Sequence, residues 1–367
     1  MKIIPVSEPN IETKEIAYVN KAVKSGWVSS IGEFIEKFEA NFAKFCNRKY
    51  GVSTGNGTHA LHLALEALGI GKGDEVIVPD FSFIAPANAV HYVGAKPVFV
   101  DAEKDTWNMD PKEIKKRVNL KTKAIIVVHL YGNMCDMDEI MEIARKNKLF
   151  VIEDAAEAHG SKYKDNMAGS FGDISCFSFY GNKIITTGEG GMCLTNDPKI
   201  NKKMRLLRDH GMTHNNKYWH EIVGFNYRMT NLQAALGCAQ LERIGDFLKT
   251  KKRNAVLYEK FLKDVPWIEF QTTKPWRENN YWMFTILIKE NSKYSRAEIM
   301  NILKKKRVET RNVFYSASIM PVHSKYFNKK DKFQNSVYIS KRGINLPSST
   351  KLTEKEIKYI CNIIKSL

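Results

Sequence analysis

Seven short apolar runs rich in β-branched residues punctuate the first two hundred residues of the chain. They span residues 50–53, 75–79, 96–101, 123–129, 149–154, 174–179 and 190–195. Between the first five runs, apolar residues recur at helical spacing. Strands that alternate with helices predict an α/β fold with a mostly parallel, seven-stranded sheet covered by helices on both faces. The last two runs have no helical segment between them, so the strand–helix–strand order is expected to break there.

The pattern changes after Met229, where a long helical stretch runs to about residue 258. A strand over residues 282–288, a helix over 295–306 and a closing helix over 353–364 follow. These elements predict a smaller C-terminal α+β domain. At 367 residues the chain exceeds the usual size of a single core. We therefore expect a large domain over residues 1–245 and a small domain over 246–367.

The charge of the chain is concentrated in its C-terminal third. Residues 246–367 hold 26 Lys or Arg and 11 Asp or Glu, whereas residues 1–245 hold 31 and 29. A lysine-rich solvated face is the preferred interpretation, because no nucleic-acid-binding motif accompanies the charge. The opening residues lack the apolar core of a signal peptide, and no long uncharged apolar run follows. We expect a cytoplasmic protein with no membrane and no nucleic-acid partner.

The six cysteines form no CxxC pair and show no metal-ligand spacing. They are interpreted as reduced thiols, and no metal site is expected. This interpretation agrees with the cytoplasmic location.

One lysine is the leading candidate for covalent chemistry. The apolar run 174–179 breaks at Gly181, Lys183 follows, and a glycine-rich turn at 188–191 leads into the next run. A lysine just beyond a buried strand is partly desolvated, which lowers its pKa and frees the neutral amine to attack a carbonyl. A Schiff base with pyridoxal 5'-phosphate (PLP) needs such an amine. A surface lysine in a loop would look the same, so other segments must supply the remaining partners of the cofactor.

A strand-to-helix turn and a hydroxyl are candidates for the phosphate of the cofactor. Gly57 and Thr58 stand at the start of a predicted helix, where free backbone amides favour an anion. Ser178 ends the strand before Lys183 and could hydrogen-bond the same phosphate, or simply cap a turn. Many strand-to-helix turns look alike, so this signal is weak by itself.

Three further residues could hold the ring of the cofactor. Asp154 ends the strand LFVIED, where its carboxylate could keep a pyridinium nitrogen protonated, or cap a helix. Glu157, one helical turn on, could reach the ring hydroxyl. Phe83 could stack on the ring, although a lone Phe usually belongs to a core. His159 is interpreted as a polar turn residue.

Taken in order, several motifs resemble the DegT/DnrJ/EryC1/StrS family of sugar aminotransferases over essentially the whole chain. They are GNGTHA, PDFSFIAPAN, HLYGN, VIEDAAEAHGS, FGDISCFSFYGNKIITTGEGG, GFNYRMTN, KYWH at 217–220 and RGINLPS at 342–348. The resemblance implies the PLP-dependent fold type I and a homodimer whose active sites are shared at the interface. It also implies that Asn226 reaches the phosphate in the neighbouring subunit. Substrate contacts are assigned to six residues: Trp27, Ser29, Asn182, Arg228, Arg311 and Tyr315.

The chain departs from one branch of the family in a loop that borders the substrate. The branch that makes GDP-perosamine reads RPxFYPxHxxP there, whereas this chain has Asn312, Ser316 and Ser318 at the two prolines and the histidine. The identity of the sugar and nucleotide is therefore left open. A dehydratase branch of the family replaces the Schiff-base lysine with histidine, and Lys183 argues against that chemistry.

The resemblance implies a ping-pong transfer of an amino group from L-glutamate to a nucleotide-linked 4-keto-6-deoxy sugar. The preferred acceptor is GDP-4-keto-6-deoxy-mannose, whose amination at C4 gives GDP-perosamine for O-antigen or a related glycan. A dTDP- or UDP-linked 3- or 4-ketosugar is the nearest alternative, and other PLP chemistry is a second. A non-catalytic regulator that binds nucleic acid through residues 246–367 is a distant third.

Overall fold

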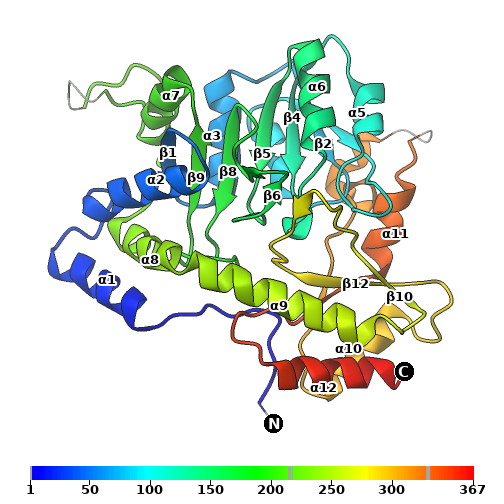
Figure 1. Cartoon of the computed structure of the whole chain (residues 1–367). Coiled ribbons are helices and arrows are strands. Elements are labelled where there is room, and N and C mark those ends of the chain that lie inside the picture. The colour runs from blue at the N-terminus through cyan, green and yellow to red at the C-terminus, as the bar shows by residue number, and fades with distance from the viewer. Residues whose placement is uncertain (1, 214–215, 217, 328–330) are drawn as a thin grey trace.

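The computed structural model describes residues 2–213, 216, 218–327 and 331–367. A seven-stranded sheet forms its centre (Figure 1). The strands lie in the order β1 (Tyr50–Thr54), β9 (Gly191–Thr195), β8 (Ile174–Ser178), β5 (Phe150–Asp154), β4 (Thr122–Val128), β2 (Glu75–Pro79) and β3 (Lys96–Val100). All seven strands correspond to the apolar runs expected from the sequence.

The sheet is parallel except at one strand. β3, β2, β4, β5 and β8 pair in parallel, whereas β9 pairs antiparallel with both β8 and β1. The break in the strand–helix–strand order was expected at this place, because a short connection returns the chain in the opposite direction. The mostly parallel α/β architecture is confirmed.

Helices cover both faces because side chains along each strand alternate between two cores. In β4, Ile125 and Val127 join one core, whereas Ala124 and Ile126 join the other. The first core includes residues of α2 (Glu33–Phe45), α5 (Pro111–Arg117), α6 (Met137–Asn147) and α8 (Asn231–Glu242). The second includes residues of α3 (Gly57–Leu68), α4 (Ala85–Tyr92) and α7 (Pro198–Arg208).

The C-terminal part has its own sheet and core. Four strands lie in the order β10 (Ile268–Phe270), β12 (Phe284–Ile288), β14 (Gly343–Leu346) and β13 (Arg311–Asn312), all antiparallel. Their core includes residues of α9 (Ile244–Leu262), α10 (Arg296–Lys305) and α12 (Glu354–Lys365). Figure 1 shows α8 and α9 as one band below the large sheet, with α12 beneath α9. The proposed boundary at residues 245 and 246 falls in the first turn of α9 and stays a prediction.

Several elements were not expected from the apolar pattern. They are α1 (Thr13–Lys24), α2, α7, α11 (Gln334–Arg342), the strands β10, β13 and β14, the small sheet of β6 (Lys162–Tyr163), β7 (Asn166–Met167) and β11 (Arg277–Glu278), and the 3-10 helices Leu130–Gly132, Ala317–Ile319 and Pro321–Tyr326. The two-residue strands are too short for a period to show.

All six cysteines are free and buried. Within the described ranges, none of the helices has the length and apolarity that a bilayer crossing needs. In the same ranges, no group of three or more His, Cys, Asp or Glu side chains could hold a metal ion.

Candidate active site

Lys183 lies in the turn that follows β8, where its backbone N–H donates to the carbonyl of Tyr180 at 2.9 Å. Its side chain is partly buried, and Nζ stands 3.9 Å from the centre of the Trp282 ring. Burial lowers the pKa of Lys183, while the carboxylates of Glu157 and Asp154 oppose that shift. The amine is therefore held in a site where its neutral form is more accessible than in water.

Two buried carboxyl groups act electrostatically on this amine. Asp154 ends β5, and burial raises its pKa although Ala156 N–H donates to Oδ1 at 3.1 Å. Burial raises the pKa of Glu157 to about 7, against the opposing charge of Lys183. The Tyr131 N–H donates to Glu157 Oε2 at 2.7 Å and fixes that side chain. β5 and β8 are parallel neighbours, so their carboxyl ends bring Asp154 and the Lys183 turn to one edge of the sheet.

The start of α3 approaches the end of β8. Asn56 caps the helix by accepting from His59 N–H at 2.8 Å, and Gly57 and Thr58 are its first residues. A Cβ atom at Gly57 would lie 2.8 Å from Ser178 Cβ, so the two chains meet closely only because residue 57 is glycine. Backbone amides of a helix start and the Ser178 hydroxyl thus lie together, as a phosphate group requires.

Phe83 is 55% exposed, and its ring lies 5.7 Å from that of Phe314. The side chain is therefore available for stacking rather than part of a core. Asn182 has a buried Oδ1 atom with no hydrogen-bond partner among the described residues. An acceptor in that condition next to Lys183 is consistent with a bound polar group. A reactive amine, two carboxyls, a helix start with a hydroxyl and an exposed ring together fit PLP.

The other expected substrate residues lie away from this cluster or at its small-domain side. Trp27 is 56% exposed and Ser29 is also exposed, and their carbonyls accept from Asn231. Arg228 pairs with Asp209 at 2.9 Å and donates to Asn226 Oδ1 at 3.1 Å. None of these groups has a hydrogen bond or ion pair with Lys183 in the part of the chain that the structure describes.

Arg311 and Tyr315 lie in the loop whose sequence departs from the family branch. Both are exposed; Arg311 is 3.7 Å from Glu309, and Tyr315 Oη accepts from Asn312 Nδ2 at 3.4 Å. In the KYWH motif, Lys217 lies outside the described residues, whereas Tyr218 and Trp219 are exposed.

Residues 9–365 match the DegT/DnrJ/EryC1/StrS aminotransferase family. The chain belongs to this family. It is therefore a PLP-dependent sugar aminotransferase. A GDP-perosamine synthase of Escherichia coli O157:H7 is 46% identical over 364 residues, which cover 99% of this chain and 98% of the relative.

Two more relatives extend this likeness. A GDP-perosamine synthase of Vibrio cholerae is 41% identical and is covered over 99% of both chains. The PLP form of the putative sugar aminotransferase Spr1654 from Streptococcus pneumoniae superimposes with a TM-score of 0.94 at 28% identity, covering 99% of this chain and 98% of that one. The match therefore spans both sheets of this aminotransferase.

Several residues of the site were not singled out from the sequence. Trp282 contacts Lys183, and Tyr131 holds Glu157 with a left-handed backbone at φ 55°. Asn280 Nδ2 donates to the carbonyls of Glu157 at 2.9 Å and of His159 at 3.0 Å. A non-glycine residue with positive φ is a signal of strain that only coordinates reveal.

His159 lies in a turn, as expected from the sequence, but this turn is buried. It is fully buried, with its ring 5.3 Å from Phe177, 5.6 Å from Phe179 and 6.1 Å from Phe42. Burial, with the charge of Lys183 second, lowers the pKa of His159 to about 3. The burial was not expected, because α2 covers this turn from a distant part of the sequence, which the local pattern could not show.

Proposed function

We propose that this aminotransferase transfers an amino group from L-glutamate to GDP-4-keto-6-deoxy-mannose and so forms GDP-perosamine for O-antigen or a related glycan. The observation that carries the proposal is the identity of 41–46% with GDP-perosamine synthases over nearly the full chain. The buried Lys183 with its two carboxyl neighbours supplies the groups that this reaction needs. A cytoplasmic location belongs to the same proposal, because all six cysteines are free thiols.

In the proposal, Lys183 is the residue that bonds the cofactor, and Asp154 holds the ring nitrogen. Glu157 would face the ring hydroxyl, Phe83 would stack on the ring, and the amides of Gly57 and Thr58 with the Ser178 hydroxyl would hold the phosphate. When bound, PLP supplies the electron sink that makes the Cα proton of the amino donor acidic.

The residues of the chain then move the proton. With its pKa lowered by burial, Lys183 Nζ is a base that can take the Cα proton of the donor and later return it. Burial raises the pKa of Asp154, whereas the Ala156 amide and Lys183 favour its charged form, which is the form that would stabilise a positive ring nitrogen. The same groups serve the second half-reaction in reverse order, in which the ketosugar accepts the amine.

We also propose a homodimer in which each subunit completes the site of the other. Large apolar side chains are exposed on two segments of the chain: Trp27, Val28 and Ile31 on the first, and Tyr218, Trp219, Ile222 and Val223 on the second. Asn226 is exposed beside them, so it is free to reach a second subunit. A monomer would leave these large apolar surfaces in water.

The test of the chemistry is the Lys183→Ala variant. Wild-type protein is expected to carry covalent PLP and to form 2-oxoglutarate from glutamate. The variant is expected to lose both the covalent adduct and turnover, measured by absorbance, mass spectrometry and product analysis. Lys355→Ala, an exposed residue of α12, is the matched control. Turnover by Lys183→Ala with added PLP would contradict the role of the lysine.

The test of the substrate is a panel of GDP-, dTDP- and UDP-linked ketosugars with glutamate as donor. GDP-4-keto-6-deoxy-mannose is expected to have the highest kcat/KM, and amination is expected at C4. The nearest alternative, a dTDP- or UDP-linked substrate, is favoured by one observation: Asn312, Ser316 and Ser318 replace the residues usual in the GDP-perosamine branch. A preference for another nucleotide would make that alternative the function.

A further inference from the structure

Trp282 is the nearest aromatic neighbour of the lysine amine, and it comes from a different part of the fold. It stands just before β12, and its side chain is buried, with 4% of its surface exposed. Lys183 Nζ lies 3.9 Å from the centre of its ring, well within the range of a cation–π contact. Nothing in the local sequence around Lys183 supplies this ring.

Hydrogen bonds hold Trp282 at the edge of its ring and at its backbone. The indole N–H donates to the carbonyl of Asn182 at 2.7 Å, so Trp282 grips the residue directly before Lys183. The backbone N–H of Trp282 donates to Asn280 Oδ1 at 2.8 Å. Its carbonyl accepts from the buried Lys251 Nζ at 2.8 Å. The indole N–H bond fixes the ring itself, and the two main-chain bonds fix the backbone that carries it.

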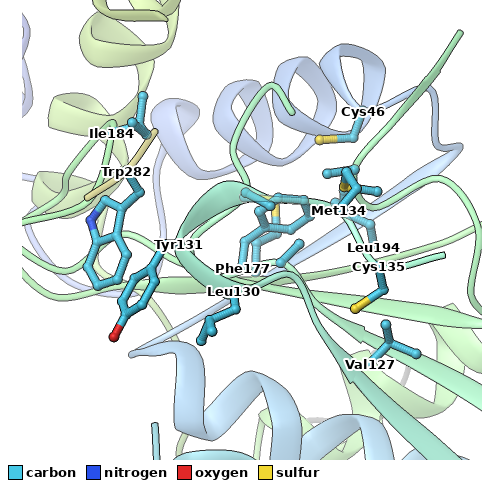
Figure 2. Packing of buried hydrophobic residues seen from close by; sticks show 14 of the residues in the cluster. Cys46, Val127, Leu130, Tyr131, Met134, Cys135, Phe177, Ile184, Leu194 and Trp282 are labelled. Atoms are coloured by element: carbon cyan, nitrogen blue, oxygen red, sulfur yellow. The ribbon is translucent and has the colours of Figure 1, made fainter. Parts of the chain in front are cut away.

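A second aromatic ring supports the first. The Tyr131 ring lies 6.1 Å from that of Trp282 at an interplanar angle of 25°. Phe314 in turn lies 5.4 Å from Tyr131 at 19°. Figure 2 shows Trp282 and Tyr131 next to each other at one side of the packed apolar residues. The indole is therefore held by packing as well as by hydrogen bonds.

The charged groups that face the amine are few. Asp154 and Glu157 favour the charged form of the amine, whereas burial opposes it. The nearby His159 ring is neutral, because its pKa is lowered to about 3, so it adds no positive charge. The face of an indole is the negative end of a quadrupole and is the best of the aromatic partners for a cation. Trp282 thus adds an attraction that is directed to one place, the face of its ring, to the attraction of the two carboxylates.

We propose that Trp282 is a positioning residue for Lys183, whose amine rests on the indole face beside Asp154 and Glu157 whenever it is not bonded to the cofactor. The released amine is then kept where it can take and return a proton, instead of swinging to other positions allowed by its long side chain. The inference rests on the proposed function to the extent that Lys183 is the lysine that carries PLP.

The experiment is a titration of Lys183 in full-length protein from which PLP has been removed. Trace labelling with an amine-selective acylating reagent between pH 6 and pH 11, read by peptide mass spectrometry, reports the neutral fraction of each lysine. Trp282→Leu keeps apolar bulk without a ring, and Trp282→Phe keeps a weaker ring. Tyr258→Phe is the matched control, because Tyr258 is equally buried and loses one hydrogen bond, that to the Pro347 carbonyl.

The labelling midpoint of Lys183 is expected to fall by about one pH unit in Trp282→Leu, by less in Trp282→Phe and not in Tyr258→Phe. The midpoint of exposed Lys355 is expected to stay constant in all four proteins. An unchanged or raised midpoint in Trp282→Leu would overturn the proposal. If that variant does not fold, the smaller shift in Trp282→Phe decides, and its absence overturns the proposal equally.

A second arm separates this inference from the proposed function. Added PLP should protect Lys183 of the wild-type protein from the reagent. If PLP does not protect Lys183 but the labelling midpoint still falls in Trp282→Leu, the assignment of Lys183 to the cofactor is contradicted and the role of the indole stands. If PLP protects Lys183 but the midpoint does not change in the Trp282 variants, the role of the indole is contradicted and the assignment stands.

Discussion

Two lysines of this enzyme show that burial by itself does not make a reactive amine. Lys251 is buried, and burial lowers its pKa to about 7, but its described hydrogen-bond partner is the carbonyl of Trp282. Lys183 also has its pKa lowered by burial, yet it faces Asp154 and Glu157. Lys251 holds the backbone at Trp282, whereas Lys183 interacts electrostatically with two carboxyl groups that can also be protonated.

The Glu157→Gln variant tests the electrostatics of this site. Because the pKa of Glu157 is raised to about 7 in the folded state, the folded protein binds one more proton than the unfolded chain between about pH 4.5 and 7. The free energy of unfolding should therefore fall as pH rises through this window, by up to about 3 kcal/mol. Glutamine cannot titrate, so the variant should lose less stability between pH 5 and pH 7.5.

The measurement is urea denaturation of PLP-free protein at the two pH values. Glu142→Gln is the control, since Glu142 is exposed and pairs with Lys146 on the surface of α6. Equal pH dependence in wild-type protein and Glu157→Gln would show that Glu157 does not carry the shift.

At the scale of elements, the loop after β13 is fastened to the end of β2 by one carboxyl group. Asp80 accepts from the Ser316 hydroxyl and from Ser318, whose N–H lies at 2.7 Å and Oγ at 3.2 Å. The Ala317 N–H donates to the Asp80 carbonyl at 2.8 Å. Both serines are positions at which the sequence departs from the pattern of the GDP-perosamine branch, and the structure shows that they attach this loop to the large sheet.

The double variant Ser316→Ala/Ser318→Ala should loosen this attachment in a pH-dependent manner. Burial raises the pKa of Asp80 to about 6, and the serines restrain that rise by solvating the charged form. Without them the charged carboxyl is buried with fewer donors, so the loss of stability should reach about 2–4 kcal/mol at pH 8. Near pH 5 Asp80 is largely protonated and the loss should be smaller.

Urea denaturation at pH 5 and pH 8 checks this expectation. Ser292→Ala, which removes a hydroxyl that bonds Tyr294 far from Asp80, is the control and should show no such pH dependence. A loss in the double variant that is the same at both pH values would mean that Asp80 is not the titrating group.

At the scale of the whole molecule, the two parts of the chain differ in charge far more than in size. Residues 246–367 contain 26 basic and 11 acidic residues, against 31 and 29 in the rest. Excess positive charge attracts an anionic nucleotide sugar over distances comparable to the Debye length, about 8–10 Å in physiological salt. We expect this charge to affect the capture of substrate rather than the chemical step.

Accordingly, kcat/KM for the nucleotide sugar should fall several-fold, up to about tenfold, between low and high salt, while kcat stays constant. Charge reversal of Lys304, Lys305 and Lys306 at the end of α10 should flatten this dependence. Reversal of three exposed lysines of α5 in the large domain, Lys112, Lys115 and Lys116, is the control. Steady-state kinetics over a salt series provides the measurement, and equal slopes for both variants would exclude steering by the small domain.

Much of the large sheet was determined by the sequence alone. Strands buried on both faces must be apolar along their whole length, so the seven runs marked the seven strands. The missing helix before residue 190 marked where the strand–helix–strand order breaks, and the structure showed that the next strand is antiparallel. Because parallel strands end at one edge, the ends of β5 and β8 bring Asp154 and Lys183 together there. The roles proposed for the motif residues in the C-terminal part and at a subunit interface came from family resemblance instead.

Only the tertiary structure decided which distant residues complete the site. Trp282 lies 99 positions from Lys183, and Ser316 lies 236 positions from the Asp80 carboxyl that it binds. Hydrophobic periodicity reports which face of an element is buried but carries no information on which other element covers that face. For this reason the sequence did not predict the contacts of Trp282, Tyr131 and His159, which depend on how α2 and the C-terminal part pack against the sheet.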